Sequence, residues 1–110
     1  MIENTISDIE AKIHGAKSIS EERRQELLQM LGTLKSEVAT LAKTHDEQAQ
    51  SIAGFTQLSA HEATRAKQNA ESLNLSIKGL RSSVDGFEQS HPKLVHIVNS
   101  ISNTLASLGI

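Results

Sequence analysis

The chain has 110 residues, with 13 acidic and 11 basic side chains, a formal net charge of −2, and no cysteine, tryptophan or tyrosine. This composition excludes disulfides and cysteine-ligated metals, and it lacks the basic clusters and aromatic residues typical of nucleic-acid binding. A core of Leu, Ile, Val and Ala, with two phenylalanines and one proline in the whole chain, favours long helices packed on each other over a β-sandwich or barrel.

The first predicted element is a short helix over residues 2–15. Isoleucines recur there at spacings of four, three and four residues, which places them on one face of a helix: Ile2, Ile6, Ile9 and Ile13. Gly15 is placed to end the helix. The segment is acidic and amphipathic rather than basic and then apolar, so we expect no signal peptide. No apolar run reaches the roughly 20 residues of a membrane span, and we therefore expect a cytoplasmic protein.

The second predicted helix covers residues 20–53. Ser18 and Glu21 fit a capping box, and Ser20 is a competing N-cap. Every three or four residues the helix carries an apolar side chain, in the order Leu27, Leu31, Leu34, Val38 and Leu41. This 3.5-residue period calls for a partner helix.

Two interpretations of the middle of the chain stay open, because the second apolar stripe is four residues out of phase with the first. In one, residues 20–87 form a continuous rod with a stutter, about 100 Å long at 1.5 Å per residue. In the other, which we favour, Gly54 ends the second helix, and Ser59 and Glu62 form the capping box of a third helix over residues 59–88. The stripe of that helix comprises Ala63, Ala66, Ala70, Leu73, Ile77, Leu80, Val84 and Phe87.

A helix junction is predicted at Ser90, His91 and Pro92, because proline disfavours a helical conformation of the preceding residue and suits the first turn of a new helix. We expect the His91 side chain to cap a fourth helix over residues 92–108. The predicted fold class is all-α: an antiparallel hairpin, or coiled coil, of two long helices that sets Leu34 near Leu80. Two short flanking helices complete a four-helix bundle at one end.

The other end of this hairpin would bury little area per residue. A second copy of the chain would supply the missing contacts, so we predict a homo-oligomer, a dimer or a tetramer, that also binds an unidentified protein partner. The predicted association seam consists of the alanines Ala63, Ala66 and Ala70 together with His45, Gln48 and Ile52.

No residue pattern supports catalysis. His61 and Glu62 begin like a zinc-protease motif, but Arg65 stands where the second histidine is required. Glu88 and His91 have the spacing of a di-iron ligand pair once, without a second copy. We therefore predict a non-enzymatic protein without cofactor or metal that acts through protein–protein contacts. The alternative function is metal or small-ligand binding by a helical bundle through His45, His61 or His91.

The C-terminal part of the chain resembles a known family. The stretch Phe-Glu-Gln-Ser-His-Pro-Lys-Leu at residues 87–94 and the ending Leu-Ala-Ser-Leu-Gly-Ile at residues 105–110 are similar to the bacterial family called domain of unknown function 4404. The resemblance covers mainly residues 73–110 and is looser over residues 1–42. Over residues 44–72 the sequence departs from the family, whose usual members are shorter there. The resemblance implies a helical fold and a bacterial origin, and it supplies no activity.

Overall fold

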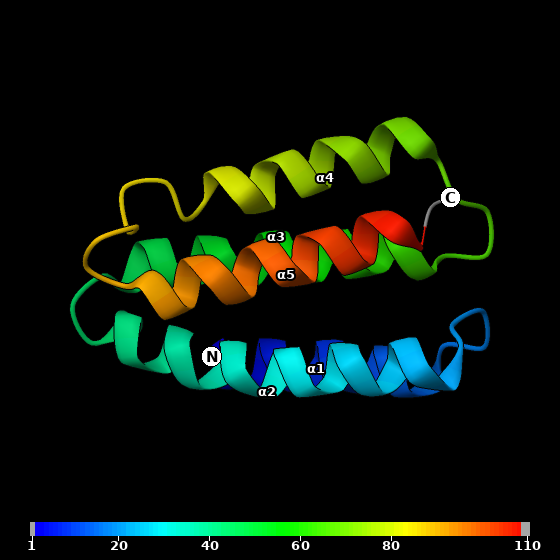
Figure 1. Ribbon diagram of the computed structural model, residues 1–110, viewed down its shortest axis with the longest axis horizontal. Helices are drawn as coiled ribbons and strands as arrows, with labels where there is room; N and C mark the ends of the chain where they lie inside the picture. The colour runs from blue at the N-terminus through cyan, green and yellow to red at the C-terminus, as the bar shows by residue number, and fades with distance from the viewer. Residues whose placement is uncertain (1, 109–110) are drawn as a thin grey trace.

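The computed structural model describes residues 2–108, and this part of the chain contains five helices and no strand (Figure 1). The helices are α1 (Ile2–Gly15), α2 (Glu21–Ala42), α3 (Asp46–Thr64), α4 (Ala70–Ser82) and α5 (Pro92–Ser107). The all-α fold class is confirmed. The first and last predicted helices are present with almost the expected limits, whereas the two long helices predicted between them are each interrupted.

The predicted helix over residues 20–53 is wrong beyond Ala42, where α2 ends. The backbone N–H of His45 donates to the carbonyl oxygen of Leu41 at 2.8 Å, and α3 then begins at Asp46. The interruption has a physical reason, because an unbroken helix would place polar His45 and Gln48 on the apolar stripe. Restarting the helix after His45 leaves both side chains exposed.

The predicted loop at Gly54 and the capping box at Ser59 and Glu62 are also wrong. Helix α3 runs through all three positions, and Ser59 and Glu62 are buried inside it. The chain breaks instead at residues 65–69, and the Asn69 side chain caps α4 by accepting a hydrogen bond from the backbone N–H of Ser72 at 2.9 Å. Helix α4 ends at Ser82, well short of the predicted residue 88.

Neither the rod nor the two-helix hairpin is present. The described chain extends 37 Å along its longest axis, far less than the roughly 100 Å of a continuous helix. Within residues 2–108, α2 and α4 make no contact with each other, so Leu34 and Leu80 are buried in separate helices that do not pair. The four-helix bundle at one end of a two-helix arm is therefore replaced by a five-helix bundle.

Helix α3 is the central element, because it packs against each of the other four described helices. Its buried side chains are mostly small, which allows several helices to approach it closely: Ala49, Ile52, Ala53, Thr56, Ser59, Ala60, Glu62 and Ala63. The Thr56 hydroxyl lies fully buried and donates to the carbonyl oxygen of Ile52 at 2.7 Å. The hydroxyl is thereby paired inside the core, where an unpaired polar group would be costly.

The chain contains two similar helical hairpins, α2–α3 and α4–α5. A shift of 46 positions, such as residue 27 to residue 73, superimposes the apolar residues Leu27, Leu31, Leu34, Val38 and Leu41 on Leu73, Ile77, Leu80, Val84 and Phe87. Figure 1 shows that α2 and α4 run in one direction and α3 and α5 in the other. Exchanging the two hairpins leaves the pattern of contacts among these four helices unchanged.

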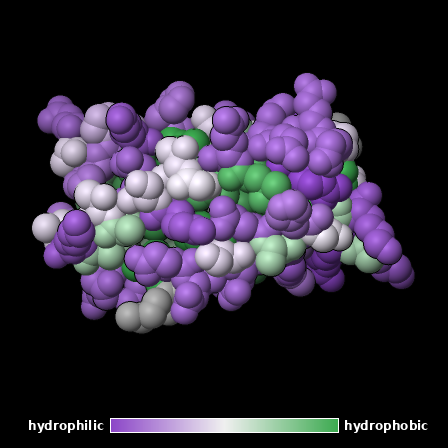
Figure 2. Space-filling model, turned by 90° about the horizontal axis from the view of Figure 1, so that it is seen from below, coloured by the Kyte–Doolittle hydropathy of each residue, from purple (hydrophilic) through white to green (hydrophobic). Residues whose placement is uncertain are grey.

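Helix α1 has no counterpart in this repeat. Its four isoleucines, between 0% and 8% exposed, are buried where α1 packs against α2 and α3, and α1 does not contact α4 or α5. Most side chains on the α1 and α2 side of the molecule are hydrophilic (Figure 2). Within residues 2–108, no helix combines the length and the apolar character that crossing a bilayer requires.

Candidate functional site

Two histidines occupy equivalent places at the starts of α3 and α5. His45 precedes α3 with φ −137° and ψ 62°, and His91 precedes α5 with φ −138° and ψ 63°. Pro92 occupies the first turn of α5, as expected. Neither histidine side chain makes a capping hydrogen bond, so the predicted capping role of the His91 side chain is wrong. The Oγ atom of Ser90 instead lies 2.9 Å from Nδ1 of His91.

The two imidazoles meet around Phe87. The centroid of the Phe87 ring lies 5.4 Å from that of His45 and 5.5 Å from that of His91, and the two imidazole centroids are 6.2 Å apart. All three pairs are close to perpendicular, the edge-to-face arrangement that aromatic rings prefer. We call His45, Phe87 and His91 the ring cluster. The contacts within the ring cluster connect the α2–α3 junction with the segment between α4 and α5.

A sequence signal for this cluster exists. Thr44-His45 and Ser90-His91 are a hydroxyl residue followed by histidine, 46 positions apart, like the apolar stripes of the two hairpins. The Oγ1 atom of Thr44 lies 2.8 Å from Nδ1 of His45, which matches the contact between Ser90 and His91. Phe87 was assigned to a helix stripe by its spacing. Its role between the two histidines depends on the folded arrangement.

The histidines do not form a larger ligand set. His61 is near the opposite end of α3 from His45, about 24 Å away at 1.5 Å per residue. Its Nδ1 atom lies 3.1 Å from Nζ of Lys12 in α1. Among residues 2–108, no group of three or more His, Cys, Asp or Glu side chains is placed to hold a metal ion. The cluster thus offers at most two imidazoles to a ligand.

The residues of the predicted association seam do not share one surface. Ile52 and Ala63 are 0% and 2% exposed and belong to the core of the chain itself. His45 and Gln48 are exposed at the start of α3, whereas Ala66 is in the loop after α3 and Ala70 begins α4. The prediction assumed one helical phase through residues 59–88. The break at residues 65–69 changes this phase, so the predicted seam residues do not lie on one face.

Exposed apolar side chains occur instead along the contact between α3 and α4. Among residues 2–108, the large apolar residues that remain exposed are Phe55, Leu58 and Leu75, at 37%, 46% and 63%. The Phe55 ring covers Gly79, where a Cβ atom would lie only 2.6 Å from Cδ1 of Phe55. Leu58 follows Phe55 by one turn and Leu75 precedes Gly79 by one turn on the antiparallel helix (Figure 1). We call Phe55, Leu58 and Leu75 the apolar patch.

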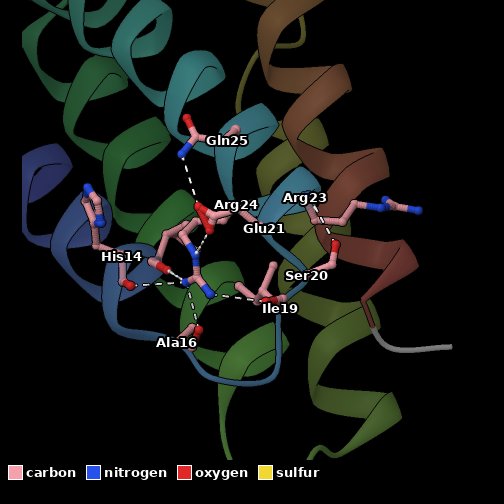
Figure 3. A network of polar contacts seen from close by, with 9 residues as sticks. His14, Ala16, Ile19, Ser20, Glu21, Arg23, Arg24 and Gln25 are labelled. Atoms are coloured by element: carbon pink, nitrogen blue, oxygen red, sulfur yellow. Dashed lines mark hydrogen bonds and ion pairs between the residues drawn. The ribbon is translucent and has the colours of Figure 1, made fainter.

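A third group of contacts fixes α1 in place. The Arg24 guanidinium donates through Nη1 to the carbonyl oxygens of Ile13 at 2.8 Å, His14 at 3.1 Å and Ala16 at 2.8 Å (Figure 3). Its Nη2 donates to the carbonyl oxygen of Ile19 at 3.1 Å. The carbonyls of Ile13 and His14 belong to the last turn of α1, where a helix terminus leaves them without intrahelical partners. Those of Ala16 and Ile19 belong to the loop between α1 and α2. Arg24 therefore binds both segments to α2.

Glu21 completes this network from the first turn of α2. Its carboxylate accepts hydrogen bonds from Gln25 at 3.3 Å and from Arg24 at 3.3 Å. The bond from Gln25, followed by that from Arg24, holds the pKa of Glu21 below its ordinary value of 4.5. The chemistry of this network is that of a structural clamp.

Comparison with known proteins identifies a family. The model of the family described as "Domain of unknown function (DUF4404)" matches residues 27–110. The matched range includes α2 from Leu27 onward, all of α3 and α4, and the Ser90-His91-Pro92 junction. It also runs through residues 44–72, where the sequence was expected to depart from the family. No curated protein and no solved structure matches the chain. The chain belongs to the family of the domain of unknown function DUF4404.

Proposed function

We propose that this protein is a non-enzymatic helical module that self-associates and acts by binding another protein. The observation that supports this role most strongly is the apolar patch, in which three large side chains stay exposed on two neighbouring helices. Single exposed apolar residues are ordinary, but a contiguous group of them marks an interaction surface. Helix-on-helix packing of the kind that builds the core would extend across such an interface.

The size of the patch sets the expected strength of self-association. Three side chains and their surroundings would contribute a contact smaller than the roughly 800 Å² per partner of a standard interface. In a dimer with a two-fold axis, the patch of each copy packs against the patch of the other, so both patches contribute to a single contact. We therefore expect a weak dimer that forms reversibly as the protein concentration rises.

Sedimentation velocity over a wide range of protein concentration tests this proposal. The wild-type chain should shift from monomer toward dimer, and Leu75→Glu should move that transition to at least about tenfold higher concentration, since it places two like charges in an apolar contact. Gln29→Glu is the matched control, because Gln29 is exposed at the equivalent position of α2. A wild-type chain that stays monomeric, or a Leu75→Glu variant that behaves like the control, would contradict self-association through the patch.

A second candidate function, metal or small-ligand binding, is favoured by the 6.2 Å separation of the His45 and His91 rings. Two imidazoles supply two of the three or four protein ligands that zinc ordinarily takes. Isothermal titration with Zn²⁺ should then show binding that His91→Asn abolishes and His61→Asn leaves unchanged. Equal zinc binding by both variants, or none by the wild type, would eliminate this candidate.

A further inference from the structure

The repeat of two hairpins reveals a groove that is filled in one half of the molecule and open in the other. In the first half, α1 lies in the groove formed by α2 and α3. The corresponding groove of α4 and α5 is an open cavity of about 620 Å³, lined by Glu71, Asn74, Leu75, Ile77, Lys78, Arg81 and Ala106. Leu75, which also belongs to the apolar patch, is its most exposed apolar side chain. No other described helix covers it in the way that α1 covers α2 and α3 (Figure 1).

The two grooves correspond residue by residue under the 46-position shift. Leu28, Leu31 and Lys35 of α2 become Asn74, Ile77 and Arg81 of α4. Ala60 of α3 becomes Ala106 of α5. An apolar side chain, a long basic side chain and an alanine thus recur at matching places. The open groove is a second version of the groove that already holds an amphipathic helix.

The basic side chains show what the open groove lacks. In the filled groove, Nζ of Lys35 pairs with Oε1 of Glu10 from α1 at 2.7 Å. In the open groove, Nη2 of Arg81 donates to Oδ1 of Asn103 in α5 at 2.7 Å. Among residues 2–108, no carboxylate lies within ion-pair distance of Arg81. Arg81 therefore occupies the position of Lys35 without a counterpart to Glu10.

Helix α1 of a second copy is a poor occupant for this groove. Arg24 holds the end of α1 and the loop after it through four carbonyl oxygens. The loop to α2 is only five residues long, at residues 16–20. Removing α1 from its own groove would also expose four isoleucines that are almost fully buried. The occupant must come from a chain that can offer a helix without losing its own core.

We propose that the groove between α4 and α5 binds an amphipathic helix of a partner protein. That helix presents apolar residues at positions i, i+3 or i+4 and i+7 to Ile77 and Ala106, as in other helix-in-groove complexes. It carries an acidic residue that pairs with Arg81 as Glu10 pairs with Lys35. This inference deepens the protein-binding part of the proposed function, on which it rests, and its groove shares Leu75 with the apolar patch.

A synthetic peptide with the sequence of α1, residues 2–15, is the probe, because it has the apolar spacing and the acidic residue that the groove requires. It is titrated to millimolar concentration into the ¹⁵N-labelled full chain, since a 14-residue helix is marginal on its own. We expect saturable amide shifts around Ile77, Arg81 and Ala106, with those around Leu31 and Lys35 unchanged. Shifts confined to Leu31 and Lys35 would mean that the peptide displaces α1, and they would overturn the proposal.

Charge reversal makes the test specific. Arg81→Glu should weaken peptide binding at least about threefold, because it places two carboxylates together, and a peptide with Glu10→Arg should restore the affinity. Lys43→Glu is the matched control, since Lys43 is an exposed cation outside the groove. Equal binding by the two protein variants would overturn the pairing with Arg81.

Two further outcomes separate this proposal from self-association. Shifts at Arg81 and Ala106 that depend on protein concentration without peptide, and that occur without shifts at Phe55 and Leu58, would assign the groove to a second copy and overturn the partner helix. Leu75 belongs to both surfaces, but sedimentation of the chain alone reports on self-association and the Arg81→Glu variant reports on the groove. Either proposal can therefore fail while the other holds.

Discussion

His45 and His91 begin different helices with nearly the same backbone angles and place their rings 6.2 Å apart, although 46 positions separate them in the chain. Each ring also contacts Phe87, so a single phenylalanine connects two helix junctions. The junctions lie at the same end of the molecule because each hairpin turns back on itself between equivalent helices (Figure 1). The ring cluster is therefore a direct consequence of the repeat.

Phe87→Ala should lower the free energy of unfolding by about 2 kcal/mol, less than the 3–5 kcal/mol typical of a fully buried phenylalanine, because Phe87 is half-buried. The measurement is urea denaturation followed by circular dichroism. Gln89→Ala, at an exposed position of the same segment, is the control and should change stability little. Equal stability of the two variants would show that the ring contacts contribute nothing.

Arg24→Ala should destabilise the chain by about 2 kcal/mol, because hydrogen bonds to charged groups contribute about 1.5–3 kcal/mol and Arg24 binds four carbonyl oxygens. The loss should be local first, so amide hydrogen exchange should accelerate in α1 more than in α5. Lys17→Ala, at an exposed cation in the same loop, should leave exchange in α1 unchanged. Protection of α1 that survives the loss of Arg24 would contradict the clamp.

Glu21 gives the clamp a dependence on pH. Its pKa is lower in the folded chain than the ordinary 4.5, so the folded state favours the charged carboxylate. This contribution to stability is present above about pH 4.5 and is lost as the pH falls through the folded pKa. Glu21→Gln should therefore make the melting temperature decline less steeply as the pH falls below about 4.5. An identical decline in the variant and the wild type would contradict this linkage.

Replacing either of two glycines inside helices by alanine should change the stability of the chain, in opposite directions for the two positions. Gly79→Ala should destabilise the chain by about 1 kcal/mol or more, because overpacking against the Phe55 ring outweighs the gain in helix propensity. Gly32→Ala meets nothing within 4 Å and should stabilise it by up to about 1 kcal/mol. Thermal melting of the pair is the measurement, and a stabilised Gly79→Ala variant would show that Phe55 does not pack closely on α4.

The outer helices could be predicted because their signals are local. Four isoleucines at helical spacing mark α1, and Pro92 marks the start of α5. The interruptions at residues 43–45 and 65–69 could not be read from the apolar stripe, because a 3.5-residue period is compatible with one long helix or two shorter ones. Asn69 followed by Glu71 was a usable start signal for α4, but the regular spacing of Ala63, Ala66 and Ala70 concealed it.

The candidate surfaces were predicted only in part. The Ser90-His91-Pro92 junction was identified, but its contact with His45 depends on the packing of two hairpins and is not encoded by any local spacing. The small residues of the predicted seam favour close approach of a second copy, yet Ala63 lies, like Ile52, in the core of one chain. Small side chains allow close helix approach in both cases, and the sequence alone does not specify whether the partner helix belongs to the same chain.

Helix α3 carries Phe55 and Leu58 of the apolar patch and packs, at the centre of the bundle, against both helices that line the open groove. Native-state hydrogen exchange of the wild-type chain measures, residue by residue, how strongly the amides of α3 are protected. Amides of α3 around Ala53, Thr56 and Ala60 should exchange only through global unfolding, with the slowest rates in the molecule. Faster, local exchange of these amides than of those in α2 and α5 would contradict the central position of α3.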